Sequence, residues 1–425
     1  MNSTGIEKMA SSNALPIKQT LTDAIAHHRA GRLPEAEKLY RQILTAKPDH
    51  ADALHLLGLI GHKMGAHEAA IDLMERAAKQ MPNRADILSN LGVTYSAANR
   101  YEEAIQVLRR ATNLGDVADI QFNLGNAYQG ANRHAEASAA YVQAIKNAPD
   151  MSGAWLNLGI SLIHLRQPEE AISALDRHLF LNPLSSKAKA MMLHAYLMQG
   201  RIDKANGLFN FAHHVKSVKI DVPRSYKDIH QFNGELEVQI RSRPGLRQDF
   251  KGIATRNGQQ ALALQLNSPS TIRALETTLR PLIDNYILSQ GKDLARGGIG
   301  LIQGRPYTLN INATILDTEG YQESHIHPNG VVSGVYYVRV PREIAASSIT
   351  ADQNDDNATA GWLELGRPGR ELPQAGIAPI QRVKPEEGVV YMFPSHIFHR
   401  TIPFKSVEPR ISVAFDVQVS NGTRA

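Results

Sequence analysis

The sequence predicts a multidomain α + β protein, in which an α-solenoid of helical hairpins precedes a β-barrel with supporting helices. Three observations lead to this fold class. The chain has 425 residues, more than one ordinary domain contains, and 43% of them are hydrophobic. A repeat of 33 or 34 residues fills the first half of the chain. The last third holds runs in which polar and apolar residues alternate, as is typical of β-strands.

Composition narrows the class of protein further. The chain holds 46 lysine and arginine residues against 41 aspartate and glutamate residues. This net charge of +5 is small and thinly spread, so we expect no nucleic-acid partner. There is no cysteine, which excludes disulfides and gives secretion no support. No run approaches the roughly 18 apolar residues of a membrane span, so we expect a cytoplasmic protein without a membrane partner.

Residues 1–16 carry no periodic pattern and predict a disordered tail, whereas residues 17–218 repeat. Four copies open at Ala51, Ala85, Ala118 and Ser152. Their eighth position is Gly58, Gly92, Gly125 and Gly159, and their twentieth is Ala70, Ala104, Ala137 and Ala171. Small residues at both positions let the two helices of a hairpin approach closely. The pattern resembles the tetratricopeptide repeat, and with an earlier copy near 17–50 and a degenerate one near 186–218 it predicts about six repeats.

One position of the repeat predicts a binding surface. Asn90, Asn123 and Asn157 all stand at position 6 of the first helix, which lines the concave face in arrays of this kind. Carboxamides repeated at one height could bond to the backbone of an extended peptide. The alternative is that Asn-Leu-Gly is simply common consensus in this repeat, and both readings stay open. We expect a protein or peptide partner on the concave face.

Residues 219–306 predict a linker and supporting helices. Pro223 marks the end of the helical array. Ser268 and Thr271 stand at the start of an amphipathic pattern, which predicts a capped helix. The β core then occupies 307–425. Its expected strands are 307–316, 331–340, 362–365, 377–383, 389–393 and 410–419.

Three histidines in this β region predict a metal site. Successive side chains of a strand alternate faces, so His325 and His327 point the same way. Two imidazoles on one face suit a first-row transition metal. His399 follows the apolar strand 389–393, which would carry it to the same mouth of a barrel as a third ligand.

Two further residues compete for places around the metal. His396 lies three residues before His399, and on an extended strand these two side chains face opposite ways. Glu323 lies two residues before His325 on the same face, so its carboxylate is the alternative to His327 for completing the triad.

An anion site is predicted beside the metal. Arg410 opens the strand at 410–419, and Arg410 and Ser412 share one face of it. A fixed guanidinium fork beside a hydroxyl group suits a carboxylate, whose two oxygens the fork can bind together.

In combination these motifs resemble the 2-oxoglutarate- and iron(II)-dependent oxygenases, and more narrowly a bacterial and phage branch with the pattern H-x-H-P-N…S-G-V-Y-Y-V…F-P-S…H…R-I-S. The pattern is carried here by His325, His327, Pro328, Asn329, residues 333–338, residues 393–395, His399 and residues 410–412. The resemblance covers roughly residues 225–420. It implies that 307–425 is the catalytic core, a double-stranded β-helix or jelly-roll barrel.

The resemblance also implies the roles of single residues. His325, His327 and His399 would hold Fe(II), and Arg410 with Ser412 would bind the co-substrate 2-oxoglutarate, with dioxygen as the oxidant. Asn312, Tyr336 and Tyr337 are candidates for lining the pocket. Most members of the wider family carry aspartate or glutamate at the place of His327, so this chain departs from the family pattern there.

The order of the two parts predicts a hydroxylase that acts on a protein or peptide side chain delivered by the repeats. Two alternatives stay open. A cupin-like dioxygenase with three histidines, acting on a small molecule, explains the histidines but not Arg410 and Ser412. A non-enzymatic scaffold with a decayed barrel explains the repeats alone.

Overall fold

The computed structural model describes residues 16–115, 117–244, 246–248, 254–264, 270–292, 298–348, 350, 352–376 and 380–419. Contacts divide the chain into two compact units, Met1–Ser161 and Leu162–Ala425. Three predictions fall wholly or partly outside the described residues. They are the tail at 1–16, of which Pro16 alone is described, the cap at Ser268, and the first part of the strand at 377–383.

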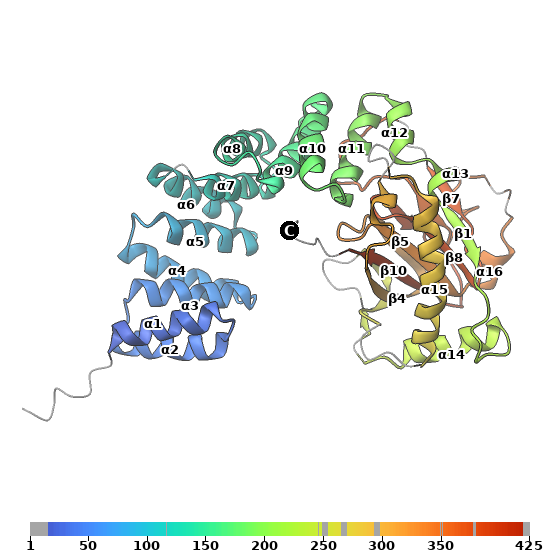
Figure 1. Cartoon of the computed structure of the whole chain (residues 1–425), viewed down its shortest axis with the longest axis horizontal. Coiled ribbons are helices and arrows are strands. Elements are labelled where there is room, and N and C mark those ends of the chain that lie inside the picture. The colour runs from blue at the N-terminus through green and yellow to red at the C-terminus, as the bar shows by residue number, and fades with distance from the viewer. Residues whose placement is uncertain are drawn as a thin grey trace, which may run out of the picture. The chain divides into compact units, whose positions relative to one another are not determined.

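The first unit is a run of helical hairpins (Figure 1). Its helices are α1 (Ile17–Arg29), α2 (Leu33–Ala46), α3 (Ala51–Lys63), α4 (His67–Gln80), α5 (Ala85–Ala97), α6 (Tyr101–Leu114), α7 (Ala118–Gly130) and α8 (His134–Asn147). Helix α9 (Ser152–His164) begins in this unit and ends in the second one. The helices start at the predicted repeat positions, so the predicted solenoid of repeated hairpins is confirmed.

The glycine at position 8 of each repeat allows the close approach within a hairpin. A Cβ atom added to Gly58 would lie 2.8 Å from the Cγ atom of Met74, and one added to Gly125 would lie 2.5 Å from the Tyr141 ring. Ala70 and Ala137, at position 20, are completely buried against them. Any larger side chain at these positions would push the two helices apart.

The second unit holds the remaining helices and a sheet. Its helices are α10 (Pro168–Leu181), α11 (Ser186–Met198), α12 (Ile202–Leu208), α13 (Phe211–His214), α14 (Ile229–Arg241), α15 (Ser270–Ser289), the 3-10 helix η2 (Ile299–Ile302) and α16 (Arg342–Ala346). Its strands are β1 (Lys216–Lys219), β2 (Arg247–Gln248), β3 (Thr255–Ala261), β4 (Thr308–His325), β5 (Val332–Arg339), β6 (Leu363–Leu365), β7 (Gln381–Val383), β8 (Val389–Pro394), β9 (His399–Thr401) and β10 (Arg410–Gln418).

The strands form one antiparallel sheet in the order β1-β8-β5-β10-β4-β9-β6-β7, with β3 also pairing β4. Most neighbours along this order are non-consecutive strands, β6 and β7 being the exception, and the sheet curls into the predicted jelly-roll barrel (Figure 1). Strand β4 is longer than predicted, because β3 and β9 continue to pair with it as far as His325.

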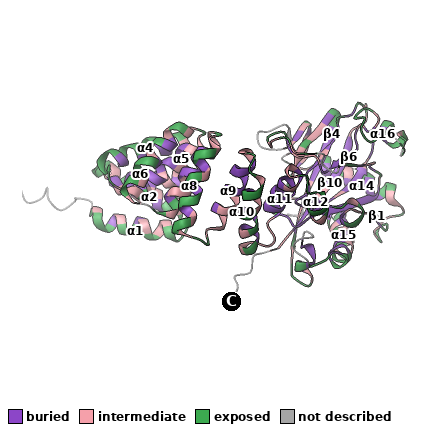
Figure 2. Cartoon of the chain, turned by 90° about the horizontal axis from the view of Figure 1, so that it is seen from above, coloured by how far each residue is buried: buried purple, intermediate pink, exposed green. Residues whose placement is uncertain are grey.

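Helices α14 and α15 support the barrel from outside. Their apolar residues share one buried cluster with the outward-facing residues of β4 and β10, including Phe232, Leu275, Ile311 and Phe415. Figure 2 shows buried residues in purple along the barrel strands, beside helices that also carry exposed residues in green. The predicted supporting helix beyond Ser270 is therefore present and packs on the barrel through the apolar stripe read from the sequence.

The last repeat helices also belong to the packed second unit. The Ser186 hydroxyl of α11 donates to the carbonyl oxygen of Gly330 at 2.6 Å. The Nε2 atom of His396 lies 3.0 Å from the carbonyl oxygen of Leu208 at the end of α12. Strand β1 extends the sheet beside β8. A boundary near residue 218 stays a prediction, and close contacts cross it.

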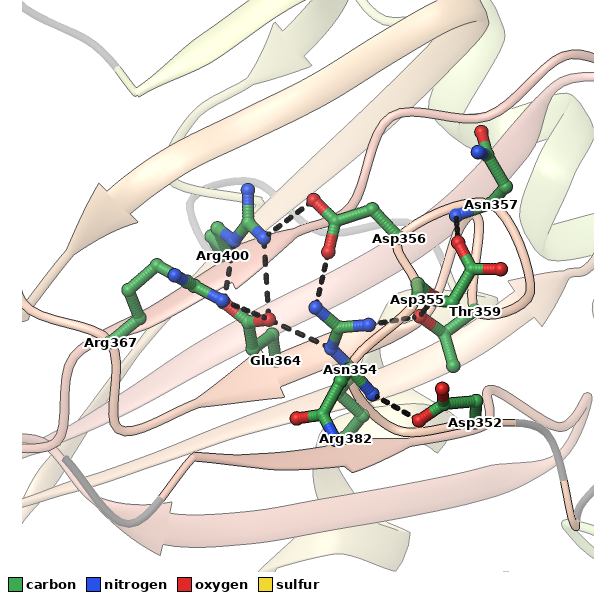
Figure 3. Close-up of polar contacts among 10 residues, drawn as sticks. All are labelled: Asp352, Asn354, Asp355, Asp356, Asn357, Thr359, Glu364, Arg367, Arg382 and Arg400. Carbon is green, nitrogen blue, oxygen red and sulfur yellow. Dashed lines mark hydrogen bonds and ion pairs between the residues drawn. The ribbon is translucent and has the colours of Figure 1, made fainter. Parts of the chain in front are cut away.

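A buried group of charges fixes the segment before β6 (Figure 3). Glu364 on β6 is completely buried and accepts hydrogen bonds from Arg367 at 2.5 Å, Arg382 at 2.8 Å and Arg400 at 2.6 Å. Asp356 pairs with Arg382 and, at 3.1 Å, with Arg400. The segment before β6 is thus tied by ion pairs to the outer side of β7 and β9.

Candidate active site

The three predicted histidines meet at one end of the barrel. His325 is the last residue of β4 and His399 the first of β9, and the two are paired across these antiparallel strands. His327 follows two residues after His325, where its backbone N–H donates to the carbonyl oxygen of Ser395 at 3.1 Å. One ligand atom from each of the three rings lies within 4.8 Å of the others. Three imidazoles grouped in this way could hold one metal ion.

Hydrogen bonds set the tautomer of each ring. The Nδ1 atom of His325 lies 2.7 Å from the carbonyl oxygen of Glu323, and that of His399 lies 3.0 Å from the carbonyl oxygen of Ile397. The Nδ1 atom of His327 lies 2.6 Å from the carboxylate of Asp416. Carbonyl and carboxylate oxygens only accept, so the proton sits on Nδ1 in each ring and the Nε2 lone pair is left for a metal.

Burial keeps two of the rings neutral. It lowers the pKa of His325 to about 4, and the neighbouring His327 adds to this effect. Burial, followed by the two other imidazoles, holds the pKa of His399 well below its usual range. Neutral imidazole is the form that binds a metal, because protonation would occupy the donor nitrogen.

The two competing residues lie outside this group. His396 is 1% exposed and faces Leu208 rather than the three rings. The carboxylate of Glu323 is exposed and pairs with Arg256 at 3.0 Å. Within the described ranges of the chain, His325, His327 and His399 are the one group of histidine and acidic side chains close enough to hold a metal.

Arg410 lies buried in the same pocket as the histidines. Its side chain is 1% exposed, and the Nη2 atom donates to the hydroxyl oxygen of Tyr337 at 3.0 Å. The guanidinium carbon stands 4.8 Å from the centre of that ring. In the described part of the chain no carboxylate pairs with Arg410, and its Nε atom has no hydrogen-bond partner. Burial lowers the pKa of Arg410, which expresses the cost of a charge with so little compensation.

Ser412 and two of the three pocket candidates line this pocket. Ser412, Asn312 and Tyr337 border it, with the Oδ1 atom of Asn312 accepting from the backbone N–H of Ala263 at 2.9 Å. Tyr336 instead points to the outer face of β5, where its hydroxyl donates to Asn233 on α14 at 2.6 Å. Adjacent strand residues face opposite sides, so Tyr336 and Tyr337 do not line one pocket together.

Sequence reasoning missed several polar residues around the pocket. Asp416, 6% exposed on β10, contacts His327 directly. Strand alternation could have revealed it: Asp416 lies an even number of residues after Arg410 and Ser412, so its side chain faces the same side of the strand. The remaining polar lining comes from Gln260, Thr314, Gln322 and Thr401.

The three asparagines at position 6 link each repeat to the repeat before it. Each is half-buried and makes a side-chain hydrogen bond through its amide nitrogen to the preceding repeat. The pairs are Asn90 with His55 at 2.9 Å, Asn123 with Ser89 at 3.2 Å and Asn157 with Asn126 at 2.9 Å. Each amide nitrogen carries two N–H groups, so a peptide would bond to the carbonyl oxygens or to the second N–H of these amides, or would displace the neighbouring side chains.

Two kinds of protein-family model match the chain. The family described as "Putative 2OG-Fe(II) oxygenase" matches residues 311–416, the part that holds all three histidines, Arg410 and Ser412. Two families described as "Tetratricopeptide repeat" match residues 21–85 and 122–186, and residues 62–121. No curated protein matches the chain.

Two similar solved structures each match less than half of the chain. One, entitled "Crystal structure of MamA", is 23% identical, with a TM-score of 0.36, and the match covers 37% of this chain and 94% of that one. Another, a PilF protein of Pseudomonas aeruginosa, is 19% identical, with a TM-score of 0.40, covering 45% of this chain and 89% of that one. Among the described helices, none is long and apolar enough to cross a membrane.

Proposed function

Because the chain joins tetratricopeptide repeats to a domain of the 2-oxoglutarate- and iron(II)-dependent oxygenase family, we propose that it is a hydroxylase of protein or peptide side chains. His325, His327 and His399 hold Fe(II) through their Nε2 atoms. Arg410 and Ser412 bind the distal carboxylate of 2-oxoglutarate. The repeats capture the substrate chain.

Arg410 is the observation that carries this proposal. A buried guanidinium without a carboxylate partner is costly, and folds keep such a group where a ligand supplies the missing anion. Its place in the pocket of the histidines fits a ligand that reaches both the metal and the arginine. A dicarboxylate with a keto group at one end has this shape and charge.

The three imidazole rings are suitable ligands for Fe(II). Imidazole nitrogen is a ligand that Fe(II) accepts, and each ring is already held with its Nε2 lone pair free. When bound, the iron would supply the activation of dioxygen that oxidises a C–H bond. The chain itself orients the rings, neutralises the co-substrate carboxylate and surrounds the reacting atoms with a largely buried wall.

The same arginine weighs against both alternatives. A cupin-like dioxygenase needs no anion site beside its three histidines, and a retired barrel has no reason to keep an uncompensated charge buried. The polar residues Gln260, Thr314, Gln322 and Thr401 further suit a pocket that receives a polar substrate group.

The proposal that the repeats deliver the substrate to the metal rests on general properties of such arrays. Arrays of this kind commonly bind proteins, and a tethered capture surface raises the local concentration of a substrate at the metal. The asparagines Asn90, Asn123 and Asn157 are the candidates for contacting the bound chain.

Turnover of the co-substrate tests the proposal without knowledge of the substrate. Full-length protein loaded with Fe(II), in air and with ascorbate as the reductant that takes up the second oxidising equivalent, should convert 2-oxoglutarate slowly to succinate and carbon dioxide. The His399→Ala variant should not, because it lacks one of the three ligands. Wild-type protein that binds iron stoichiometrically yet releases no succinate above the variant would refute the function.

A further inference from the structure

A set of three histidines brings no negative charge to a bound metal ion. Two imidazoles and a carboxylate bring one negative charge to a metal, whereas three neutral imidazoles bring none. An Fe(II) ion held by the latter set keeps one more unit of positive charge, which changes its affinity and its redox potential. The ring concerned is that of His327, the one of the three whose Nδ1 atom faces a carboxylate.

A buried carboxylate stands behind this histidine. The Nδ1 atom of His327 lies 2.6 Å from each carboxylate oxygen of Asp416, whereas the Nδ1 atoms of His325 and His399 face uncharged backbone carbonyls. The side chain of Asp416 is 8% exposed, so water screens its charge little. No lysine or arginine pairs with Asp416 among the described residues.

Asp416 cannot itself be the missing ligand. It contacts the Nδ1 atom of the His327 ring, which leaves the opposite nitrogen, Nε2, as the donor for a metal. The carboxylate of Asp416 therefore acts on the metal through the His327 ring, and not as a ligand of its own.

Hydroxyl groups hold this carboxylate in place. Ser333 on β5 donates to the Oδ1 atom of Asp416 at 2.6 Å, and the Ser395 hydroxyl lies 2.8 Å from that of Ser333. Since Ser333 has a single hydroxyl proton and gives it to Asp416, Ser395 donates to Ser333. Both serines belong to the motifs that carry the family resemblance, and in this chain of hydrogen bonds they hold the Asp416 carboxylate in position.

The backbone makes room for the same network. A Cβ atom on Gly330 would lie 2.6 Å from the Ser395 hydroxyl and 3.3 Å from the Oδ1 atom of Asp416. Glycine at this position lets the turn after His327 close directly over the two serines and the carboxylate.

We propose that Asp416 is a positioning residue that supplies, through the His327 ring, the negative charge which the three-histidine set lacks. The hydrogen bond gives the His327 imidazole partial anionic character, so this ring brings part of a negative charge to the metal. The inference rests on the proposed function, because it assumes that iron binds at the three histidines.

The electrostatic consequence has a direction. Removal of the charge weakens the binding of Fe(II), and it weakens the binding of Fe(III) more, because the ferric ion carries the larger charge. The midpoint potential of the bound iron therefore rises when Asp416 is neutralised.

The Asp416→Asn variant of the full-length protein tests this. Its amide oxygen still accepts from His327, so the ring keeps its tautomer while the charge is lost. We expect the dissociation constant for Fe(II), measured by competition with a chelator under anaerobic conditions, to rise about 10–100-fold. The midpoint potential, followed by the ferric electron paramagnetic resonance signal, should move to a more positive value.

Matched variants separate charge from structure. Glu323→Gln removes an equal charge from an exposed carboxylate paired with Arg256, and should change the Fe(II) dissociation constant by less than about twofold. Asp416→Glu retains the charge and should restore the wild-type potential at least in part. If asparagine at position 416 prevents folding, Asp416→Ser offers a smaller hydroxyl acceptor and carries the same expectation.

The outcomes distinguish this inference from the proposed function. Wild-type protein that binds no iron contradicts both. Wild-type binding with the same affinity and potential in Asp416→Asn overturns the role of Asp416 and leaves the oxygenase proposal intact. An equal rise in potential in Glu323→Gln would also overturn it, because any nearby acid would then serve.

Discussion

Single residues of the site are explained by hydrogen bonds that the sequence does not display. Strand alternation placed His325 and His327 on one side, and an antiparallel partner strand brings His399 to them. Their tautomers depend on two backbone carbonyls and on Asp416, which lies 89 positions beyond His327. Such a long-range contact has no local pattern in the sequence, so the candidate ligands could be predicted but their orientation could not.

The choice of the third ligand gives a test at this scale. His399→Ala should abolish stoichiometric Fe(II) binding, because two imidazoles alone hold the ion weakly. His396→Ala should keep the bound iron while lowering the melting temperature, because this buried ring bonds to Leu208 and not to the site. Metal content and thermal melting of both purified variants check this. Equal loss of iron in the two variants would show that the third ligand is wrongly assigned.

At the scale of elements, strands β6, β7 and β9 are joined by the charges around Glu364 (Figure 3). The register of β6 and β9 relates these charges to the site. Leu365 pairs with His399, and Glu364 pairs with Arg400. Adjacent residues face opposite sides, so Glu364 and Arg400 lie on the face of the sheet opposite His399. The sequence did not predict that Asp356, in the segment before β6, would reach across to Arg382 and Arg400.

Neutralising Glu364 should loosen these strands. Removal of one partner from a buried ion cluster leaves arginines uncompensated, so Glu364→Gln should lower the free energy of unfolding by about 3 kcal/mol. Denaturant titration measures this. The control Glu319→Gln, an exposed carboxylate 3.8 Å from Lys405, should change stability by less than about 0.5 kcal/mol. Equal effects would show that the cluster contributes nothing special.

The same residue predicts a dependence on pH. Burial alone would raise the pKa of Glu364, but hydrogen bonds from Arg367 and Arg400 outweigh this and lower it to about 2. A carboxyl with a depressed pKa stabilises the fold above its unfolded pKa of about 4.3, and this contribution is lost as the pH falls from there toward 2. The difference in unfolding free energy between wild type and Glu364→Gln should therefore shrink over that interval. A constant difference from pH 7 to pH 3 would contradict the ionised role.

The asparagines of the repeats give a further test at this scale. Alanine at Asn90, Asn123 and Asn157 together should raise KM for a protein substrate and leave uncoupled turnover of 2-oxoglutarate unchanged, because the metal site is untouched. The control replaces two exposed carboxamides of the second helices, Gln106 and Gln143, by alanine. Since the asparagines also link adjacent repeats, thermal melting must accompany the kinetics. Unchanged KM in the triple variant would reduce the asparagines to a feature of the repeat.

For the whole molecule, composition and periodicity predicted both halves of the fold, because repeats and alternating strands are local patterns. The end of the repeats was harder to read. Helices α11 and α12 keep the pattern of a hairpin, as Ala205 shows by its complete burial, yet they also contact the turn after His327 and the turn before His399. Tertiary packing of this kind overrides a boundary drawn from sequence periodicity.

Fragments should reveal this dependence. A fragment of residues 165–425 retains the contacts of α11, α12 and β1 with the barrel, whereas one of residues 219–425 loses them. We expect the longer fragment to melt cooperatively at the higher temperature, and the shorter to lose the Fe(II) site. Circular dichroism and metal content measure the two properties. Equal melting temperatures would place the functional boundary at residue 218 after all.

Anaerobic titration of the Fe(II)-loaded full-length protein with 2-oxoglutarate tests most directly whether this pocket binds a metal and a keto acid together. Chelation should produce a weak visible charge-transfer band that saturates with one equivalent of the co-substrate. In Arg410→Leu the band should require at least tenfold more 2-oxoglutarate, since loss of a buried charge-assisted pair costs ~2–5 kcal/mol. Arg339→Leu, on the neighbouring strand but paired outside with Glu237, should titrate like the wild type. Absence of the band in iron-loaded wild-type protein, or equal affinities in all three proteins, would contradict the proposed chemistry.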